Sequence, residues 1–222
     1  MQIIALLPMK GHSERVSNKN IRSFAGKPLF HKVASILEQS DKVREILINT
    51  DSNIIAEDAM KHFSKVKILD RPKEIRGDFV PMNDIIAHDL SILDDEHFVQ
   101  THSTNPLLRL ETLNKAIAEY FALPAEYDSL FSVTRLQTRL YWEDGKPVNH
   151  NPQELLRTQD LPPLFEENSN FFLFSKKSFH EAGNKRIGLK PKMFEMESLE
   201  AMDIDTEENF VLAEAVYHMR NK

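Results

Sequence analysis

Two short segments of the chain carry residues that could do phosphate chemistry. The first, close to the N-terminus, holds three cations, Lys10, Arg15 and Lys19, together with Gly11 and Ser13. Cationic side chains, a hydroxyl group and a glycine that lets the backbone come close are groups that bind a polyphosphate. The segment is neither a Walker A loop nor a G-x-G-x-x-G fingerprint, so a solvated basic loop is an equally good interpretation of its spacing.

The second segment, Asp203-Ile204-Asp205, places two carboxylates two positions apart. In an extended backbone such residues project from one face, while Ile204 points into the core. Magnesium commonly binds one or two carboxylates and completes its octahedron with phosphate oxygens and water. The alternative is a helix cap, in which Asp205 or Thr206 starts the last helix and Glu208 completes a capping box with Asp205.

Strands and helices that alternate along the chain must position these segments. Apolar runs of strand length predict strands at residues 3–7, 45–49, 66–69, 98–100, 129–134 and 171–174. Helical spacing predicts helices that open at Pro28, at a cap formed by residues 50–52, near Ile86, at Glu111 and near Phe210. This alternation predicts an α/β fold with a three-layer, doubly wound and mostly parallel sheet. The basic segment then follows the carboxyl end of the first strand, where such sheets bind ligands.

The composition restricts the classes of partner and chemistry. The net charge of −6, without a basic block, gives no support for nucleic-acid binding. The lack of cysteine excludes disulfides, thiolate metal sites and cysteine nucleophiles. No apolar run approaches the roughly 20 residues that span a bilayer, and the first residues lack the features of a signal peptide. We therefore expect a cytoplasmic protein with no membrane and no nucleic acid among its partners.

The length of 222 residues suits a single domain, 1–222, with an extension at about residues 135–170. This extension is rich in proline and has too few apolar residues to form a core of its own. It does contain aromatic residues of the kind that gather at interfaces, although these could equally pack on their own subunit: Tyr141, Trp142 and Phe165.

Several motifs resemble those of the acylneuraminate cytidylyltransferase family, whose members make CMP-sialic acid and related activated sugars. The opening motif of the family matches at Pro8, Gly11, Ser13, Lys19 and Asn20. Further matches extend over nearly the whole chain, at residues 71–72, 104–109, 127–133, 157–168 and 197–210. The resemblance implies a Rossmann-like nucleotidyltransferase fold. It also implies that an acidic α-keto sugar, a sialic acid or related nonulosonate, is coupled to CMP from CTP with release of pyrophosphate.

The resemblance also implies roles for individual residues. Nucleotide binding is assigned to Met9, Lys10, Gly11, Ser13, Arg15, Lys19, Asn20 and Arg71. Catalysis is assigned to Lys10, Arg15, Lys19, Asp203 and Asp205, of which the two aspartates also bind Mg²⁺. Sugar binding is assigned to Gln100, His102 and Arg157, since a planar guanidinium suits a carboxylate. A purely structural role is an equally good interpretation of His102 and of Arg157.

Other positions depart from the family pattern. Lys10 replaces an arginine and Glu14 a lysine, and an alignment with octulosonate cytidylyltransferases lets Arg15 restore the charge lost at Glu14. His102 stands where the family has a glutamine that contacts the sugar, and a histidine close to phosphates could be charged. Residues 81–83 replace serines of which one reads cytosine, which leaves the base preference open.

These departures keep two alternatives open. The chain could be an octulosonate-type cytidylyltransferase or a purine-nucleotide-using relative, or it could be a non-catalytic dimeric nucleotide-binding protein. The resemblance also predicts a homodimer built through the extension, in which one subunit completes the sugar pocket of its neighbour. The main expectation is a magnesium-dependent enzyme that acts on CTP, or another nucleoside triphosphate, and an acidic sugar.

Overall fold

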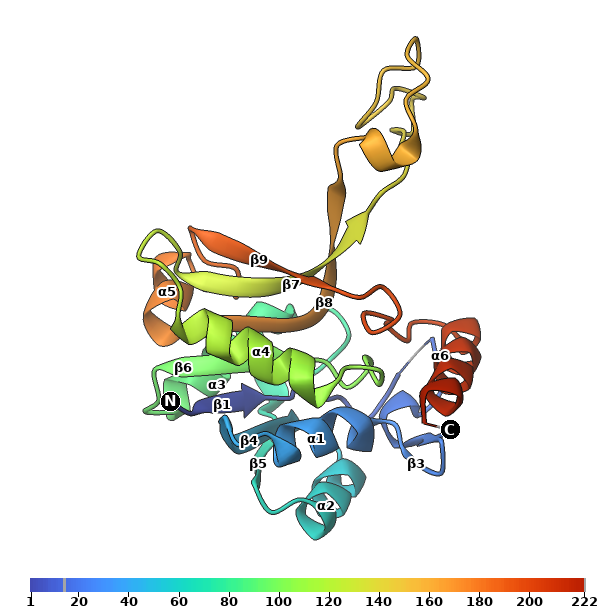
Figure 1. Ribbon diagram of the computed structural model, residues 1–222. Helices are drawn as coiled ribbons and strands as arrows, with labels where there is room; N and C mark the ends of the chain where they lie inside the picture. Colours follow the sequence, from blue (N-terminus) through green and yellow to red (C-terminus); the bar gives the residue numbers. More distant parts are fainter. Residues whose placement is uncertain (14, 222) are drawn as a thin grey trace.

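A seven-stranded sheet forms the centre of the computed structural model, which describes residues 1–13 and 15–221 (Figure 1). The strands follow one another across this sheet in the order β5-β4-β1-β6-β8-β7-β9. Their bounds are β1 Ile3–Leu6, β4 Val43–Thr50, β5 Val66–Asp70, β6 His97–Thr101, β7 Ser129–Leu136, β8 Leu164–Ser175 and β9 Pro191–Met196. Two shorter strands, β2 Ser23–Phe24 and β3 Lys27–Pro28, form a separate hairpin.

The sheet is mostly parallel, as the sequence predicts. Strand β1 pairs in parallel with β4 on one side and with β6 on the other, and β4 pairs in parallel with β5. Strand β8 runs antiparallel to β6 and β7, while β9 pairs in parallel with β7. Every residue of Ile3–Leu6 is buried, because helices cover both faces of the sheet at β1.

Helices pack on both faces of the sheet and complete three layers. They are α1 Phe30–Gln39, α2 Asn53–His62, α3 Met82–Ile92, α4 Leu110–Phe121 and α5 Lys176–Glu181, while α6 Glu207–Arg220 packs instead on the loop after β1 and on the β2–β3 hairpin. Apolar residues of α1, α2 and α4 share one core cluster with the sheet, and those of α3 and α5 share the opposite one. The packing of α1 follows from its sequence, because its buried apolar residues recur at the spacing of one helical face: Phe30, Val33, Ala34 and Leu37. Short 3₁₀ turns occur at Lys19–Ile21, Lys73–Ile75 and Thr158–Asp160.

A third apolar cluster joins the N-terminal loop to the C-terminal helix. Val16 and Phe24 pack there against Ile204 and Phe210, and all four side chains are buried. Burial of one such side chain contributes roughly 1.5–3 kcal/mol to stability. The cluster therefore fixes the segment before α6 beside the segment after β1, although the two lie at opposite ends of the chain. Figure 1 shows α6 beside the β3 region.

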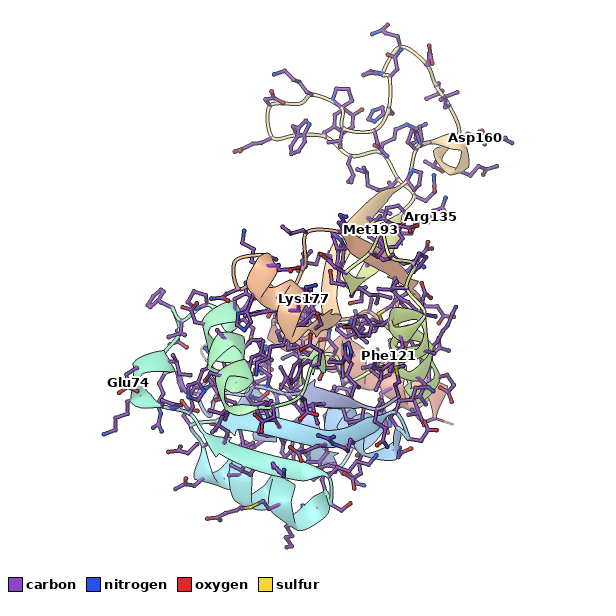
Figure 2. The ribbon with its side chains drawn as sticks, turned by 90° about the vertical axis from the view of Figure 1, so that its left-hand side faces the viewer. Glu74, Phe121, Arg135, Asp160, Lys177 and Met193 are labelled. Carbon is purple, nitrogen blue, oxygen red and sulfur yellow. The ribbon has the colours of Figure 1, made fainter. Side chains whose placement is uncertain are left out.

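The extension projects from the sheet as an arm (Figure 1). The ladder between β7 and β8 continues to the Leu136–Leu164 pair, and residues 137–163 lie beyond it. Asn149 ties the arm together, since its Nδ2 donates to the carbonyl oxygens of Thr138 at 2.8 Å and Pro162 at 3.1 Å. Asp160, labelled in Figure 2, lies on the arm beyond Arg135. Trp142 leaves 64% of its surface exposed, so the arm does not bury its aromatic residues in this chain.

Several expectations about single elements were wrong. Pro28 lies in the β3 strand and α1 begins at Phe30, because residues 23–28 first form a hairpin that packs on α6. Strand β8 begins at Leu164, inside the proline-rich extension and before the predicted start at residue 171, because it pairs with the end of β7. Strand β9 and helix α5 were not predicted at all. Among the described residues, no helix combines the length and apolar character that crossing a membrane requires.

Candidate active site

A cleft of about 570 Å³ opens at the carboxyl edge of the parallel strands. After β1, the chain adds β4 and β5 on one side of β1 and then adds β6 on the other side of β1. A reversal of this kind creates a crevice between the loops that follow the neighbouring strands. The cleft is lined by the loop after β1, the loop after β6 and the segment before α6.

The cations of the first loop and the carboxylates before α6 meet in this cleft. Arg15 Nη2 lies 2.7 Å from Asp205 Oδ1, and Lys19 Nζ lies 3.7 Å from the same oxygen. Lys19 Nζ also donates to the carbonyl oxygen of Ile204 at 2.5 Å. Burial lowers the pKa of Lys19, while the charges of Asp203 and Asp205 act in the opposite direction. The structure thus places the basic segment after β1 and the segment that carries Asp203 and Asp205 around the same cleft.

Asp203 is the more deeply placed of the two carboxylates. Its Oδ1 is buried and has no hydrogen-bond partner among the described residues. Burial raises the pKa of Asp203, and the neighbouring Asp205 charge adds to this shift, whereas a hydrogen bond from Thr104 and the charge of Lys19 oppose it. A buried carboxylate oxygen without a partner is costly unless a cation or a proton meets it.

The backbone between the aspartates is fixed by the core and by the loop after β6. Ile204 is fully buried, as the alternation of the segment predicts, although the segment forms no strand. Its backbone N–H donates to the Thr104 carbonyl at 2.9 Å. The predicted capping box of Asp205 and Glu208 is wrong: Thr206 caps α6, and Asn209 closes the box. The Asp205 carboxylate is therefore left for Arg15 and Lys19.

Asn20 holds the first loop in place. Its Nδ2 donates to the Lys10 carbonyl at 2.9 Å, and its Oδ1 accepts from the Ser103 hydroxyl at 2.7 Å. Lys10 lines the cleft and forms an ion pair with Asp78. Ser13 and Met9 also line the cleft. Glu14 lies outside the described residues.

Gly11 serves a different purpose from the one that the sequence suggests. Its missing side chain faces α2 and not the cleft, since a Cβ placed there would lie 2.9 Å from Ser52 Cβ. Its backbone N–H donates to Asp51 Oδ1 at 2.7 Å. The glycine therefore allows the loop to pack against the N-terminus of α2. This packing, and not the close approach of a phosphate, requires a glycine at position 11.

Arg71 lines the cleft but most of its donors are used within the protein. Its Nε donates to Asn49 Oδ1 at 2.8 Å, and its Nη2 donates to the carbonyl oxygens of Asn49 at 2.8 Å and Met9 at 3.2 Å. The side chain is buried, which lowers its pKa, although the charges of Asp51 and Asp89 act in the opposite direction. Arg71 thus links the ends of β1 and β4 beneath the cleft.

The residues assigned to sugar binding separate in the structure. His102 lines the cleft, but withdrawal from solvent lowers its pKa to about 3, and the charges of Arg186 and Lys19 lower it further. Without a phosphate beside it, His102 is therefore neutral at neutral pH, and the charged form close to phosphates stays a prediction. Gln100 is fully buried and accepts a hydrogen bond from Arg186. Arg157 lies on the arm, pairs with Asp160 and does not line the cleft of its own chain.

Arg186 is a cleft residue that the sequence reading missed. It follows α5 and packs its guanidinium 4.2 Å from the centre of the Phe172 ring. Its Nε donates to Asn83 at 3.1 Å and its Nη1 to Gln100 at 2.5 Å, while its Nη2 has no hydrogen-bond partner among the described residues. Burial lowers the pKa of Arg186 to about 10, so the side chain stays charged. Arg186 lies outside the motifs that resemble the family, and the packing of α5 brings it to the cleft.

Comparison with known proteins settles the family. The cytidylyltransferase family model matches residues 4–221, nearly the whole chain. The chain belongs to the cytidylyltransferase family. The cytidylyltransferase family that the motifs suggested is thereby confirmed, and the chain is a nucleotidyltransferase.

Individual relatives agree with this family at low identity. The chain is 23% identical to a pseudaminic acid cytidylyltransferase of Campylobacter jejuni, over 100% of this chain and 99% of that protein. It is 26% identical to a CMP-N,N'-diacetyllegionaminic acid synthase of Legionella pneumophila, over 100% and 99%. It is 29% identical to N-acylneuraminate cytidylyltransferase A of Danio rerio, over 96% of this chain and 50% of that protein.

Solved structures share the fold. CMP:2-keto-3-deoxy-manno-octonic acid synthetase, solved with CTP, matches with a TM-score of 0.70 at 11% identity, over 99% of this chain and 100% of the other. A 4-diphosphocytidyl-2C-methyl-D-erythritol synthase matches with a TM-score of 0.69 at 13% identity, over 97% and 99%. The fold predicted from the alternation of strands and helices is thereby confirmed.

Proposed function

We propose that this cytidylyltransferase transfers CMP from CTP to an acidic α-keto sugar of the nonulosonate class, with Mg²⁺ held by Asp203 and Asp205. One observation carries the proposal: the two carboxylates face Arg15 and Lys19 across a single cleft. Cations that neutralise phosphate oxygens and carboxylates that hold Mg²⁺ are the two halves of a nucleotide-triphosphate site. The names of the full-length relatives supply the class of sugar.

The two aspartates fit a magnesium ion. The buried and unpartnered Asp203 Oδ1 lacks the positive charge that would offset its burial, and Asp205 lies beside it with a part-exposed carboxylate. When bound, the ion neutralises phosphate charge and orients the triphosphate, completing its shell with phosphate oxygens and water. Oxygen ligands of this type suit Mg²⁺ better than they suit a thiophilic metal.

The reaction is a displacement at the α-phosphorus of CTP. The anomeric hydroxyl oxygen of the sugar forms a bond to that phosphorus, the bond to the bridging oxygen of the β-phosphate breaks, and pyrophosphate leaves with the electron pair. The hydroxyl proton is released to water. Lys19 and Arg15 stabilise the negative charge that builds on the phosphoryl oxygens, because preorganised cations in a partly dry cleft act strongly on developing charge. Asn20 keeps the loop that carries both cations closed against Ser103.

Arg186 is our candidate for the cation that binds the sugar carboxylate. Its charge sits in the cleft beside His102, its position is fixed by Asn83 and Gln100, and its Nη2 remains available. A fixed guanidinium binds a carboxylate with directional, charge-assisted hydrogen bonds. Arg157 cannot do this within its own chain, since it lies on the arm and pairs with Asp160.

The proposal is tested by pyrophosphate release. Each of four nucleoside triphosphates is combined with a nonulosonate acid and with an octulosonate acid, with and without Mg²⁺. We expect turnover with CTP, Mg²⁺ and the nonulosonate acid. Asp203→Asn should abolish most of it, while Asp94→Asn, at an exposed aspartate away from the cleft, should not. Tight CTP binding without turnover on any sugar would instead favour a non-catalytic nucleotide-binding protein.

We also propose that the arm forms a homodimer. Trp142 and Tyr141 expose more than half of their surface, and Leu155 is 94% exposed, on a segment that has little core of its own. Aromatic and aliphatic side chains of this kind favour the centre of an interface. Analytical ultracentrifugation should give twice the mass of the chain, and Trp142→Asp should lower it. A monomer at micromolar concentration would rule the dimer out.

A further inference from the structure

Two histidines and an aspartate lie together where α1 and α2 pack side by side. His31 comes from α1 and is buried, while Asp58 and His62 come from α2 and are more exposed. None of the three lines the catalytic cleft. The cluster is therefore separate from the site assigned to nucleotide and sugar.

The donor atoms of this cluster converge. One ligand atom from each of the three side chains lies within 4.8 Å of the other two. His31 Nε2 hydrogen-bonds to Asp58 Oδ1, and His62 Nδ1 lies 3.5 Å from that same oxygen. The centres of the two imidazole rings are 5.0 Å apart. Asp58 and His62 are one helical turn apart, which brings their side chains onto the same face of α2.

We propose that His31, Asp58 and His62 form a binding site for a divalent transition metal of the zinc type, which ties α1 to α2. Imidazole nitrogen and carboxylate oxygen are ligands that Zn²⁺ takes in tetrahedral geometry, at about 2.0–2.2 Å. Ligands at that distance lie about 3.3 Å from one another, so the cluster needs small shifts of its side chains and no change of backbone. Three protein ligands leave a fourth position for water on the exposed side of His62.

Metal binding replaces the hydrogen bonds that the two histidines make to Asp58 by bonds from the ring nitrogens to the metal. A neutral imidazole carries its proton on one ring nitrogen and offers a lone pair on the other. On binding, His31 Nε2 and His62 Nδ1 each release the proton that they donate to Asp58, each ring takes up a proton from water on its other nitrogen, and His62 Nδ1 gives up its 2.8 Å hydrogen bond to the Asp58 carbonyl. That bond is exposed to solvent, so its loss costs little.

A metal ion bound between α1 and α2 would also restrict the motion of the loop after β1, which carries Lys10, Arg15 and Lys19. Helix α2 begins directly after Ser52, which caps it and touches the position of Gly11 in the loop after β1. Fixing α2 against α1 therefore holds the surface on which that loop packs. Mg²⁺ does not substitute here, because two of the three ligands are imidazoles.

The test uses the intact, metal-free protein and Zn²⁺ alone. Isothermal titration should show one equivalent of Zn²⁺ that is lost in His62→Ala and retained in His180→Ala, an exposed histidine of α5. The same equivalent should be retained in Asp203→Asn, which removes a carboxylate of the cleft. At a Zn²⁺ concentration of about 100 times the Kd, the Tm should rise by roughly 5–10 °C, and this rise should disappear in His62→Ala.

His62→Ala keeps the hydrogen bond between His31 and Asp58, so it should fold, and His62→Gln provides a second variant of closer size. Co²⁺ in place of Zn²⁺ should give the visible absorption of a tetrahedral site in the parent protein and not in either variant. Equal Zn²⁺ binding by the parent and both variants, or no binding by the parent, overturns the proposal. Neither readout depends on transferase activity, so the outcome is independent of the proposed function.

Discussion

Arg15 Nη2 and Asp205 Oδ1 lie 2.7 Å apart, and this contact joins a loop near the N-terminus to the segment before the last helix. Both side chains are substantially exposed, at 67% and 43%. An exposed ion pair of this kind contributes about 0–1 kcal/mol, so it exchanges partners readily. Under the proposed function, this weak pair lets Arg15 turn to a phosphate and Asp205 turn to Mg²⁺ without a large cost in stability.

Arg15→Ala should weaken nucleotide binding with little effect on stability. Loss of one charge-assisted contact to a phosphate costs about 1.5–3 kcal/mol, which corresponds to roughly a 10- to 150-fold rise in the Kd for CTP. Titration calorimetry with CTP and Mg²⁺ measures it. Arg44→Ala serves as the control, because Arg44 lies at the start of β4, outside the cleft, and forms a comparable ion pair with Asp95. Unchanged CTP affinity in Arg15→Ala would remove Arg15 from the site.

Lys19→Met should reduce kcat more than it changes binding. The Lys19 ammonium contacts the Ile204 carbonyl and faces Asp205, where it is held in place before the substrate arrives. Removal of one preorganised group that stabilises developing charge commonly costs about 100- to 1,000-fold in kcat. Steady-state kinetics of pyrophosphate release measures this, and circular dichroism checks that the variant folds. A kcat within a few-fold of the parent value would contradict the assigned role.

Gly11→Ala should destabilise the fold through a clash with α2. The new Cβ would lie 2.9 Å from Ser52 Cβ, and overpacking of this kind costs about 1–3 kcal/mol. Urea unfolding measures the change. The double variant Gly11→Ala with Ser52→Gly removes the obstructing side chain, while glycine at a helix N-cap costs only a few tenths of a kcal/mol. The double variant should therefore recover most of the loss, and no recovery would mean that another contact requires the glycine.

Asp89 should make the protein less stable as the pH rises from about 4 to about 6. Burial raises its pKa in the folded state from 3.8 to about 6, although a hydrogen bond from Asn49 opposes the shift. Between these values the folded state holds a proton that the unfolded state has released, so stability falls with rising pH, by about 3 kcal/mol in all. Asp89→Asn should lose this component. Urea unfolding of both proteins at pH 4 and pH 7 gives the difference, and parallel pH profiles would contradict it.

Much of the fold follows from local patterns in the sequence. The fully apolar run Ile3–Leu6 could only be a strand covered on both faces, and Ser52 caps α2 as its side-chain type predicts. The alternation of such strands with amphipathic helices then leaves a parallel sheet and its crevice as the consistent arrangement. The residues that fill this crevice could be named in advance where they follow strand ends or sit in family motifs, as Lys19 and Asp203 do.

What the sequence determined by itself is therefore most of the strands and helices, though not β9 or α5, together with the family and the two charged segments. Only the tertiary structure decided which contacts those segments make. Gly11 faces Ser52 because α2 begins there, the Asp205 carboxylate pairs with Arg15 and Lys19 because Thr206 and Asn209 cap α6, and Arg186 enters the cleft because α5 packs on β8. Periodicity and propensity act over a few residues, whereas these contacts join residues far apart in the chain, and their geometry is set only when the whole core has packed.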